Sequence, residues 1–567
     1  MSTVPGNLPT AILREVVATS GLHPSSTTSG TSAHTTPRQP AAISTRPNSG
    51  NNAPTALVIG SGFGGLAAAI RLQLKGYQVT ILEKLDGPGG RAYTYKKNGF
   101  TFDAGPTIVT APNLLEELWT MCGRNLHDDV AMRLLDPFYR IRFDDGTHFD
   151  YAGSLEGMRA EIARFNADDL PGYDRFLEEA ELCHKHGFVG LSDKAFDSLG
   201  DLFAAIPAMI KMRAWRSLFG MVSSYIKDPK LRMVLSVQSL LIGGNPFSVT
   251  CVYSLIAALE RRGGVHWAMG GTGELVRGLV RLLQQQGGSI CYDTQVKQIS
   301  IDTSTGKRLA TGVTLIDGQV LTADLVISNA DAAYTYTQMI APQHRKVWTD
   351  KKLARGDYSM SLFVWYFGIN RQYKDVPHHM MLLGPRYKEL LKDIFKKKVL
   401  AKDFSLYLHR PSATDPSMAP EGCDTYYVLA PVPHLDSGTD WRAVAEPYRK
   451  EVARRLHETV MPGFEDHIVE SFMTTPQDFQ DRLLSVKGAA FGLEPLLLQS
   501  AWFRPHNRSE DIEGLYMVGA GTHPGAGIPG VLSSARALDS VIPPAAQWQR
   551  SVSKTASAIS DTMKANG

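Results

Sequence analysis

The sequence predicts an α/β fold built around a Rossmann-like dinucleotide-binding unit. Two observations lead to this prediction. A glycine loop, Gly60-Ser61-Gly62-Phe63-Gly64-Gly65, lies between an apolar run and an Ala/Leu-rich helical stretch. A second glycine-rich segment follows the apolar run Leu515–Val518 and opens the last helical stretch. The length of 567 residues leaves room for two or three domains, because single hydrophobic cores stop growing near ~250–300 residues.

The first predicted unit alternates strand and helix. Thr55–Ile59 is a short apolar run, typical of a buried parallel strand. After the glycine loop, Leu66–Lys75 has a helical composition and is closed by Gly76. Gln78–Leu82 returns to a β pattern that ends at Glu83. Strand, loop, helix and strand thus follow one another within about thirty residues, as in a dinucleotide-binding unit.

The rest of the chain mixes strands and helices. Asp144-Asp145-Gly146 after Tyr139–Phe143 indicates a β-hairpin. Residues 155–262 are predicted to be mainly helical, and residues 340–500 to be mixed. Further strands are expected at 289–292, 296–301, 310–316, 320–328 and 515–518, and a closing helix near 531–541.

Composition excludes several classes of protein. The apolar share of 43% and the charged share of 20% are ordinary for a globular protein, and a net charge of +3 gives no argument for a nucleic-acid partner. Five scattered cysteines without a C-x-x-C pair argue against a disulfide framework or a zinc site, and we expect no metal. Residues 233–259 lack charged side chains but are interrupted by Gly-Gly-Asn-Pro at 243–246, so no transmembrane span is expected.

The N-terminal segment, residues 1–53, is rich in Ser, Thr and Pro. Such a composition buries too little apolar surface to offset the entropy of ordering, so we expect a disordered tail. An organellar transit peptide is the alternative. The wide spacing of Arg14, Arg38 and Arg46 favours a dispensable tail.

Gly60-x-Gly62-x-x-Gly65 has the spacing of a phosphate-binding loop. The first glycine allows the tight turn, the second lets the backbone approach a pyrophosphate, and the third lets helix and strand pack closely. Glu83 follows Gly60 at the distance where a carboxylate accepts the ribose hydroxyls, which also disfavours a 2′-phosphate and therefore NADP.

A second loop, Gly87-Pro88-Gly89-Gly90-Arg91, follows the second predicted strand. It brings another close-approach backbone beside the same phosphates, and Arg91 would offset their charge. An enzyme that binds only a nicotinamide cofactor does not need this loop. The two loops together favour FAD.

The C-terminal glycine-rich segment has a different role in this interpretation. Gly519–Gly525 and Gly527–Val531 can cover the flavin ring and direct the dipole of the closing helix at the N1–C2=O edge, which becomes negative on reduction. His523 in this segment is either a catalytic residue or a residue that caps the loop. No second dinucleotide motif, catalytic triad or metal motif accompanies it.

Several segments resemble the bacterial and fungal phytoene desaturases of carotenoid synthesis. The resemblance extends over about residues 55–545 and is most specific in the Gly-Ala-Gly-Thr-His-Pro-Gly-Ala-Gly-Ile-Pro-Gly-Val run. That run lies within the matching segment Gly514–Leu538, and the other matching segments are Ala56–Arg91, Gly99–Thr107, Asp403–His409, Ala419–Cys423 and Tyr426–His434.

The resemblance implies an amine oxidase-like fold, in which a discontinuous FAD-binding domain carries an inserted mixed α+β substrate domain and a helical, membrane-facing region. The expected segments are FAD-binding at 54–150, 265–335 and 505–548, helical at 151–264 and substrate-binding at 336–504, with a flexible C-terminal tail at 549–567. The cofactor-binding residues implied by position are Gly60, Gly62, Phe63, Gly64, Gly65, Glu83, Lys84, Gly90, Arg91, Thr107, Val296, Gly521, Gly530 and Val531.

The resemblance also implies the chemistry. Phytoene and carotene intermediates would lose hydride to the flavin and a proton from the neighbouring carbon, in a dry apolar tunnel, with quinone or oxygen as the final electron acceptor. Candidate proton acceptors are Asp168, Asp169, Tyr173 and Arg175, with His523 as a further catalytic candidate. An exposed helix start with capping acids is the alternative for the residues at 168–175.

Residues 201–232 carry six basic residues interleaved with large apolar ones. This pattern predicts a basic amphipathic helix at an anionic lipid surface, or else helices packed in the core with a charged outer face. With the resemblance, we expect a cytoplasmic protein peripherally attached to a membrane. A carotenoid isomerase or carotene oxidase of the same fold, and a prenyl-carrying escort protein without redox chemistry, are the alternative functions.

Overall fold

The computed structural model describes residues 53–548. The predicted tails at 1–53 and 549–567, and with them the transit-peptide alternative, lie outside the described residues apart from residue 53.

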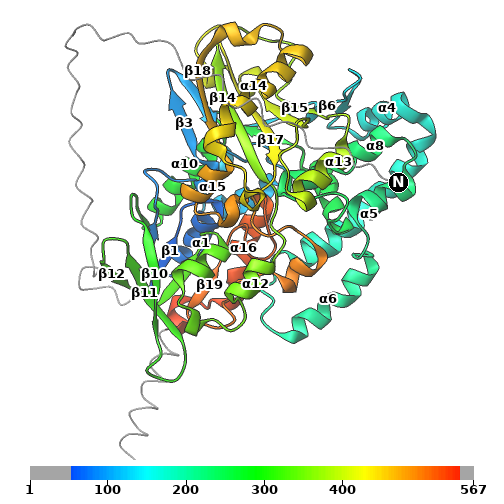
Figure 1. Ribbon diagram of the computed structural model, residues 1–567. Coiled ribbons are helices and arrows are strands. Elements are labelled where there is room, and N and C mark those ends of the chain that lie inside the picture. Colours follow the sequence, from blue (N-terminus) through cyan, green and yellow to red (C-terminus); the bar gives the residue numbers. More distant parts are fainter. Residues whose placement is uncertain (1–52, 549–567) are drawn as a thin grey trace, which may run out of the picture. The chain divides into compact units, whose positions relative to one another are not determined.

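The predicted dinucleotide-binding unit is the centre of a five-stranded parallel sheet (Figure 1). Its order is β19-β13-β1-β2-β9. The strands are β1 Thr55–Ile59, β2 Gln78–Leu82, β9 Ser289–Cys291, β13 Leu325–Ser328 and β19 Leu515–Met517. Three distant segments of the chain therefore meet in one sheet, and the loops after β1, β2, β13 and β19 share its carboxyl edge, where α/β sheets bind ligands.

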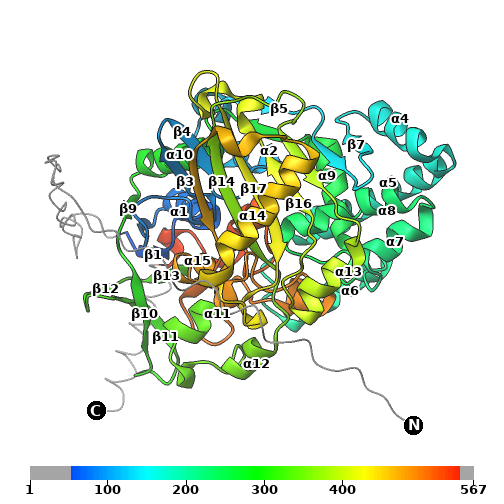
Figure 2. The ribbon, with the colours of Figure 1, turned by 45° about the horizontal axis from the view of Figure 1, so that its top comes forward.

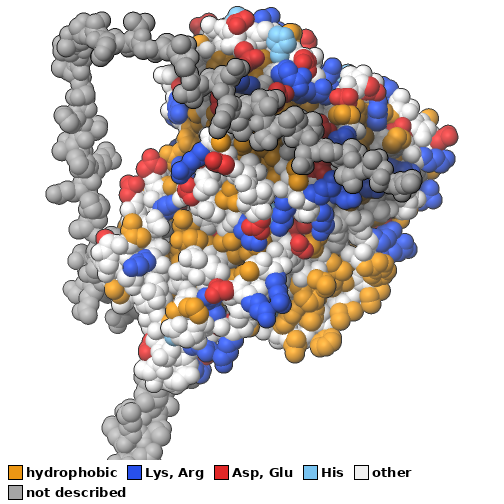
Figure 3. Space-filling model, viewed as in Figure 1, with side chains coloured by type: hydrophobic (Ala, Val, Ile, Leu, Met, Phe, Trp, Pro, Cys, Tyr) orange, Lys and Arg blue, Asp and Glu red, His pale blue; other side chains and the backbone are white. Residues whose placement is uncertain are grey.

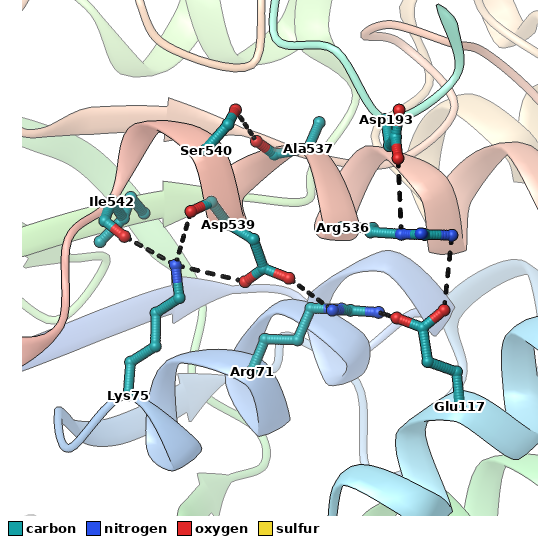
Figure 4. Close-up of polar contacts among 9 residues, drawn as sticks. All are labelled: Arg71, Lys75, Glu117, Asp193, Arg536, Ala537, Asp539, Ser540 and Ile542. Atoms are coloured by element: carbon teal, nitrogen blue, oxygen red, sulfur yellow. Dashed lines mark hydrogen bonds and ion pairs between the residues drawn. The ribbon is translucent and has the colours of Figure 1, made fainter. Parts of the chain in front are cut away.

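Helices from the two ends of the chain cover this sheet together. α1 (Phe63–Leu74) packs against α16 (Ile528–Val541), with α2 (Pro112–Met121) and α10 (Thr272–Gln285) beside them. Figure 4 shows Arg71 of α1 between Glu117 of α2 and Asp539 of α16. Lys75 also contacts Asp539, at 3.3 Å. The helices that follow the two glycine-rich loops are thus joined by packing and by ion pairs.

Three predicted boundaries differ from the structure. α1 begins at Phe63, inside the glycine loop, because Gly62 is already the extended residue before the helix. α16 begins at Ile528, three residues earlier than predicted. The predicted strand 320–328 is two strands: β12 (Val320–Thr322) pairs antiparallel with β11, whereas β13 joins the parallel sheet.

β12 belongs to a three-stranded antiparallel sheet with β10 (Val296–Asp302) and β11 (Leu309–Leu315). A larger, seven-stranded sheet has the order β18-β14-β17-β16-β15-β6-β7 (Figure 2). Its strands are β6 Tyr139–Arg142, β7 His148–Tyr151, β14 Ser361–Ile369, β15 His379–Leu382, β16 Leu406–His409, β17 Asp424–Val432 and β18 Ile468–Thr474. β6 and β7 form the predicted hairpin, so segment 54–150 contributes strands to both large sheets.

The segment predicted to be mainly helical is confirmed as such. It contains α4 Leu155–Asn166, α5 Leu170–Cys183, α6 Leu199–Lys211, α7 Leu218–Tyr225, α8 Pro229–Val234 and α9 Leu255–Gly263. These helices lie to one side of the sheets (Figure 1). Stretch 201–232 is not one amphipathic helix but most of α6, with α7 and α8, and α7 buries Leu218, Met221 and Val222.

The remaining helices and strands are mostly short. They are α3 Leu126–Asp129, α11 Ala332–Tyr334, α12 Asp350–Arg355, α13 Tyr387–Lys392, α14 Trp441–Thr459, α15 Pro476–Asp481, β3 Thr94–Lys97, β4 Phe100–Asp103, β5 Met132–Leu134 and β8 His266–Ala268. Within residues 53–548, no helix has the length and apolar character needed to cross a membrane.

Candidate active site

One cavity of about 550 Å³ extends from the carboxyl edge of the parallel sheet to α6. At the sheet, it is lined by the glycine loop after β1, by Glu83 after β2 and by Gly519 after β19. At the other end, its lining includes Leu202, Ala205 and Met209 of α6. A polar cofactor site and an apolar chamber are therefore continuous.

Glu83 is held in place by the first glycine loop. Its Oε2 accepts hydrogen bonds from the backbone N–H of Ser61 at 2.8 Å and from the Ser61 hydroxyl at 2.6 Å. Its Oε1 accepts from the N–H of Leu85 at 2.8 Å. A carboxylate offers about four lone-pair sites, and three are used here, so Glu83 can still accept one hydroxyl group of a ribose.

The glycines of the first loop have different roles. Gly60, Gly62 and Gly64 line the cavity, as does Phe63. Gly65 does not: a Cβ there would lie 2.1 Å from the carbonyl oxygen of Gly60, so this glycine permits the close packing of helix on strand. The first turn of α1 has no side-chain cap, which leaves N–H groups for phosphate oxygens.

Arg91 and Gly90 line the same end of the cavity. The Arg91 guanidinium donates to Ser485 Oγ at 3.1 Å and lies 3.9 Å from Asp331. Its Nε is buried and has no hydrogen-bond partner among the described residues. Burial lowers the pKa of Arg91 and Asp331 raises it. A buried donor without a partner fits a bound diphosphate.

Lys84 also lines the cavity, but its ammonium group is occupied. It donates to the carbonyl oxygens of Asp481 at 2.7 Å and Arg482 at 3.0 Å. Burial lowers the pKa of Lys84. The side chain therefore joins the end of β2 to the C-terminal end of α15.

Asn329 is a site residue that the sequence motifs did not predict. It follows β13, and its side chain lies between the two glycine-rich loops. A Cβ on Gly64 would be 2.7 Å from its Oδ1, and one on Gly519 would be 2.6 Å away. Polar residues directly after a buried parallel strand were the available signal.

The C-terminal loop leads into α16 at the cavity wall. Gly527 precedes the helix with φ of 94°, and α16 begins without a side-chain cap. Gly530 and Val531 line the cavity, so the positive end of the helix dipole is available there. Gly521 does not line it. A Cβ there would lie 2.6 Å from that of Ala332, so this glycine permits close packing of the two segments.

Thr107 and Val296 also line the cavity. The Thr107 hydroxyl is hydrogen bonded to the hydroxyls of Tyr427 at 2.9 Å and Tyr407 at 3.1 Å. Both tyrosines belong to the seven-stranded sheet. This contact connects the loop after β4 to the seven-stranded sheet.

His523 is buried and lines the cavity. Its Nε2 lies 2.7 Å from the carbonyl oxygen of Leu191, to which it donates, and Nδ1 has no partner within the described part of the chain. Burial lowers the pKa of His523 to about 4, so the ring is neutral. The hydrogen bond to Leu191 supports the role of a residue that holds the loop in place. The catalytic role stays a prediction, and Nδ1 is the ring nitrogen that would serve it.

The four residues predicted at the start of α5 lie elsewhere. None of Asp168, Asp169, Tyr173 and Arg175 lines the cavity. Asp169 accepts from the backbone N–H groups of Lys227 and Asp228, at 2.7 and 2.8 Å, and Tyr173 is packed in the core. The guanidinium of Arg175 lies over the Tyr225 ring. Asp169 is buried and its side chain does not cap α5, so these contacts indicate packing roles and do not match the alternative of an exposed helix start with capping acids.

Three buried histidines form a cluster behind the tyrosines. His379 and His409 are cross-strand partners on β15 and β16, and His378 lies beside them. Their ring nitrogens lie close enough to hold a metal ion. The Tyr407 hydroxyl lies 2.7 Å from Nδ1 of His379. The same Nδ1 lies 3.2 Å from Nδ1 of His409. Thr107, Tyr407, His379 and His409 thus form a chain of hydrogen bonds.

The comparisons with known proteins agree with this geometry. Residues 63–537 match the model of the flavin containing amine oxidoreductases. The chain is 48% identical over 505 residues to the neurosporene-forming phytoene desaturase of Cereibacter sphaeroides, covering 88% of this chain and 96% of that protein. It is also 48% identical over 491 residues to the lycopene-forming phytoene desaturase of a Paracoccus species, covering 86% and 97%. The chain belongs to the phytoene desaturases, within the flavin containing amine oxidoreductases.

Solved structures share the fold of this phytoene desaturase family member at low identity. Cyclohexylamine oxidase from Brevibacterium oxydans aligns with a TM-score of 0.57 and 16% identity, covering 88% of this chain and all (100%) of that one. A Rab GDI from Plasmodium falciparum aligns with a TM-score of 0.50 and 9% identity, covering 86% and 98%. The predicted amine oxidase-like fold, the FAD cofactor and the assignment as an oxidoreductase are confirmed.

Proposed function

We propose that this protein desaturates 15-cis-phytoene in several successive steps, through ζ-carotene toward neurosporene or lycopene. The observation that carries the proposal is the continuous cavity, which joins an FAD-type phosphate site to an apolar chamber suited to a hydrocarbon. The relatives whose names specify a product include both neurosporene-forming and lycopene-forming enzymes.

FAD would be held by the glycine loop, Glu83, Gly90 and Arg91 at its nucleotide end, and by the start of α16 at its ring. When bound, it supplies a two-electron hydride acceptor. The residues of the chain position the substrate and exclude water from the cavity. Leu241, Ile242 and Leu362 are among the apolar lining residues that would hold a polyene against the ring and keep water out.

We also propose that the protein takes its substrate from a membrane, as a peripheral cytoplasmic protein. α6 has apolar side chains on two faces: Leu202 and Met209 line the cavity, whereas others face outward. The outward residues are Leu199, Phe203, Ile206 and Ile210, with Trp215 just after the helix. They form the apolar patch at the lower right of Figure 3, over the position of α6 in Figure 1. One helix thus separates a lipid-compatible surface from the chamber.

Liposome flotation tests this attachment. The double change Phe203→Ser and Trp215→Ser removes two side chains that are each 64% exposed, and should release the protein from anionic vesicles. Ile316→Ser, which removes an apolar side chain 61% exposed on the β11–β12 turn, is the matched control and should still float. Equal flotation of both variants would contradict the proposal.

The desaturation itself is tested with purified, FAD-loaded protein and phytoene in liposomes. Incubation without oxygen, with an added quinone, followed by pigment chromatography should yield carotenes with additional double bonds. A parallel incubation with oxygen and without quinone shows which of the two accepts the electrons. An isomerase would change geometry without adding double bonds, and an escort protein would bind phytoene without bleaching the flavin. Either result would overturn the proposal.

A further inference from the structure

The apolar part of the cavity contains a carboxyl group that no sequence motif indicated. Most charged lining residues gather at the nucleotide end: Glu83, Lys84, Arg91, Asp331 and Arg482. Away from them, the described lining has one carboxyl group and one imidazole, those of Glu260 of α9 and His523, beside the phenol groups of three tyrosines. Ile256 and Leu259, which precede Glu260 on α9, line the cavity as apolar residues.

Glu260 is fixed through one of its two oxygens. The Tyr139 hydroxyl donates to Oε2 at 3.0 Å, and Gln238 in turn donates to the Tyr139 oxygen at 3.2 Å. Oε1 is buried and has no hydrogen-bond partner among residues 53–548. A buried carboxyl oxygen without a partner is uncommon and costly, so its retention in a substrate cavity indicates a use.

The proton affinities of the two candidates differ strongly. Burial raises the pKa of Glu260 to about 8, although the hydrogen bond from Tyr139 lowers it in part. Burial lowers the pKa of His523 to about 4. A difference of about four pKa units corresponds to a roughly 10,000-fold higher proton affinity for the Glu260 carboxylate. Glu260 is therefore the better proton acceptor.

We propose that Glu260 is the catalytic base of desaturation. In each step, one carbon of the substrate gives up a C–H bond as hydride to the bound FAD. The neighbouring C–H bond breaks, its electron pair becomes the new C=C bond, and its proton goes to the Glu260 carboxylate. The hydrocarbon loses two electrons, which leave through the flavin to quinone or oxygen. The inference rests on the proposed desaturation.

The first test measures the rate of anaerobic flavin bleaching by phytoene as a function of pH. In the wild type, the rate should rise about tenfold from pH 7 and level off above pH 8, as the carboxylate form becomes dominant. Glu260→Gln should lower the rate about 100- to 10,000-fold and remove the rise. Glu494→Gln, at a buried carboxyl outside the cavity lining, is the control and should keep both.

Tyr139→Phe distinguishes a base from a structural carboxyl. It leaves Glu260 in place but removes the hydrogen bond that lowers its pKa. The rise in rate should therefore move to higher pH. On FAD-free protein, the infrared band of a protonated carboxyl that disappears near pH 8 should be missing in Glu260→Gln and present in Tyr139→Phe.

Each outcome decides between the possibilities. If Glu260→Gln bleaches within threefold of the wild type with the same pH dependence, or if Tyr139→Phe leaves that dependence unchanged, Glu260 is not the base. If Glu260→Gln fails to fold, the Tyr139→Phe shift and the infrared titration still decide. If wild-type flavin is never reduced by phytoene, the proposed desaturation fails first, and this inference fails with it.

Discussion

Single residues at the carboxyl edge of the parallel sheet have two different roles in cofactor binding. Glu83, Arg91 and Asn329 supply polar atoms, whereas Gly65 and Gly521 supply only the absence of a side chain. The first group follows strands β2 and β13, and the second lies where two backbones meet. The motif glycines are therefore not interchangeable, and each can be tested separately.

Gly65→Ala should damage the site without touching the ligand. The new Cβ would lie 2.1 Å from the Gly60 carbonyl oxygen, which the rigid loop cannot avoid without shifting. Overpacking of this kind costs about 1–3 kcal/mol of unfolding free energy. Urea unfolding and flavin-fluorescence titration should show lower stability and at least about tenfold weaker FAD binding. Gly190→Ala, whose Cβ would meet nothing closer than 3.5 Å, should behave like the wild type, and equal behaviour of the two variants would contradict this account.

At the scale of elements, the sequence predicted those helices and strands that contiguous residues determine. β1, α1 and β2 follow from an apolar run, a glycine loop and a helix closed by Gly76, which are all contiguous. The split of 320–328 was missed because β12 and β13 share one apolar pattern but pair with different partners. Asn329 and Glu260 were missed for the same reason: long-range packing brings them to the cavity.

The pairing of α1 with α16 leads to a prediction about Arg71. This guanidinium is 5% exposed and bonds carboxylates of α2 and α16. Arg71→Met would leave two partly buried carboxylates without their main counter-charge, and should lower the unfolding free energy by about 2–3 kcal/mol. Arg454→Met is a matched control, because Arg454 also bonds two carboxylates but is 58% exposed, and it should leave the unfolding free energy close to the wild-type value. Similar losses in chemical denaturation would contradict a special role for this contact.

At the scale of the whole molecule, the dry cavity that the substrate needs also affects the stability of the fold. Its wall keeps a carboxyl group and a histidine neutral at pH 7, because burial disfavours the charged form of each. The same burial applies to the cluster at His378, His379 and His409, where it holds the pKa values well below the usual range. The dryness that suits a hydrocarbon substrate therefore makes the stability of the fold depend on pH.

Two variants should reveal this dependence with opposite signs. The folded pKa of Glu260, about 8, exceeds its ordinary value of 4.5, so Glu260 stabilises the fold increasingly as pH falls from 8 to 4.5, by roughly 5 kcal/mol in total. The folded pKa of His523, about 4, lies below its ordinary value of 6.5, so its contribution is lost as pH falls from 6.5 to 4, by roughly 3 kcal/mol.

Unfolding free energies of FAD-free protein between pH 4 and 9 test both signs. The wild type should gain stability relative to Glu260→Gln as the pH falls, and should lose stability relative to His523→Gln. Because burial in one cavity wall causes both effects, the absence of both pH-dependent differences would mean that the wall admits water and is not a dry hydrocarbon chamber.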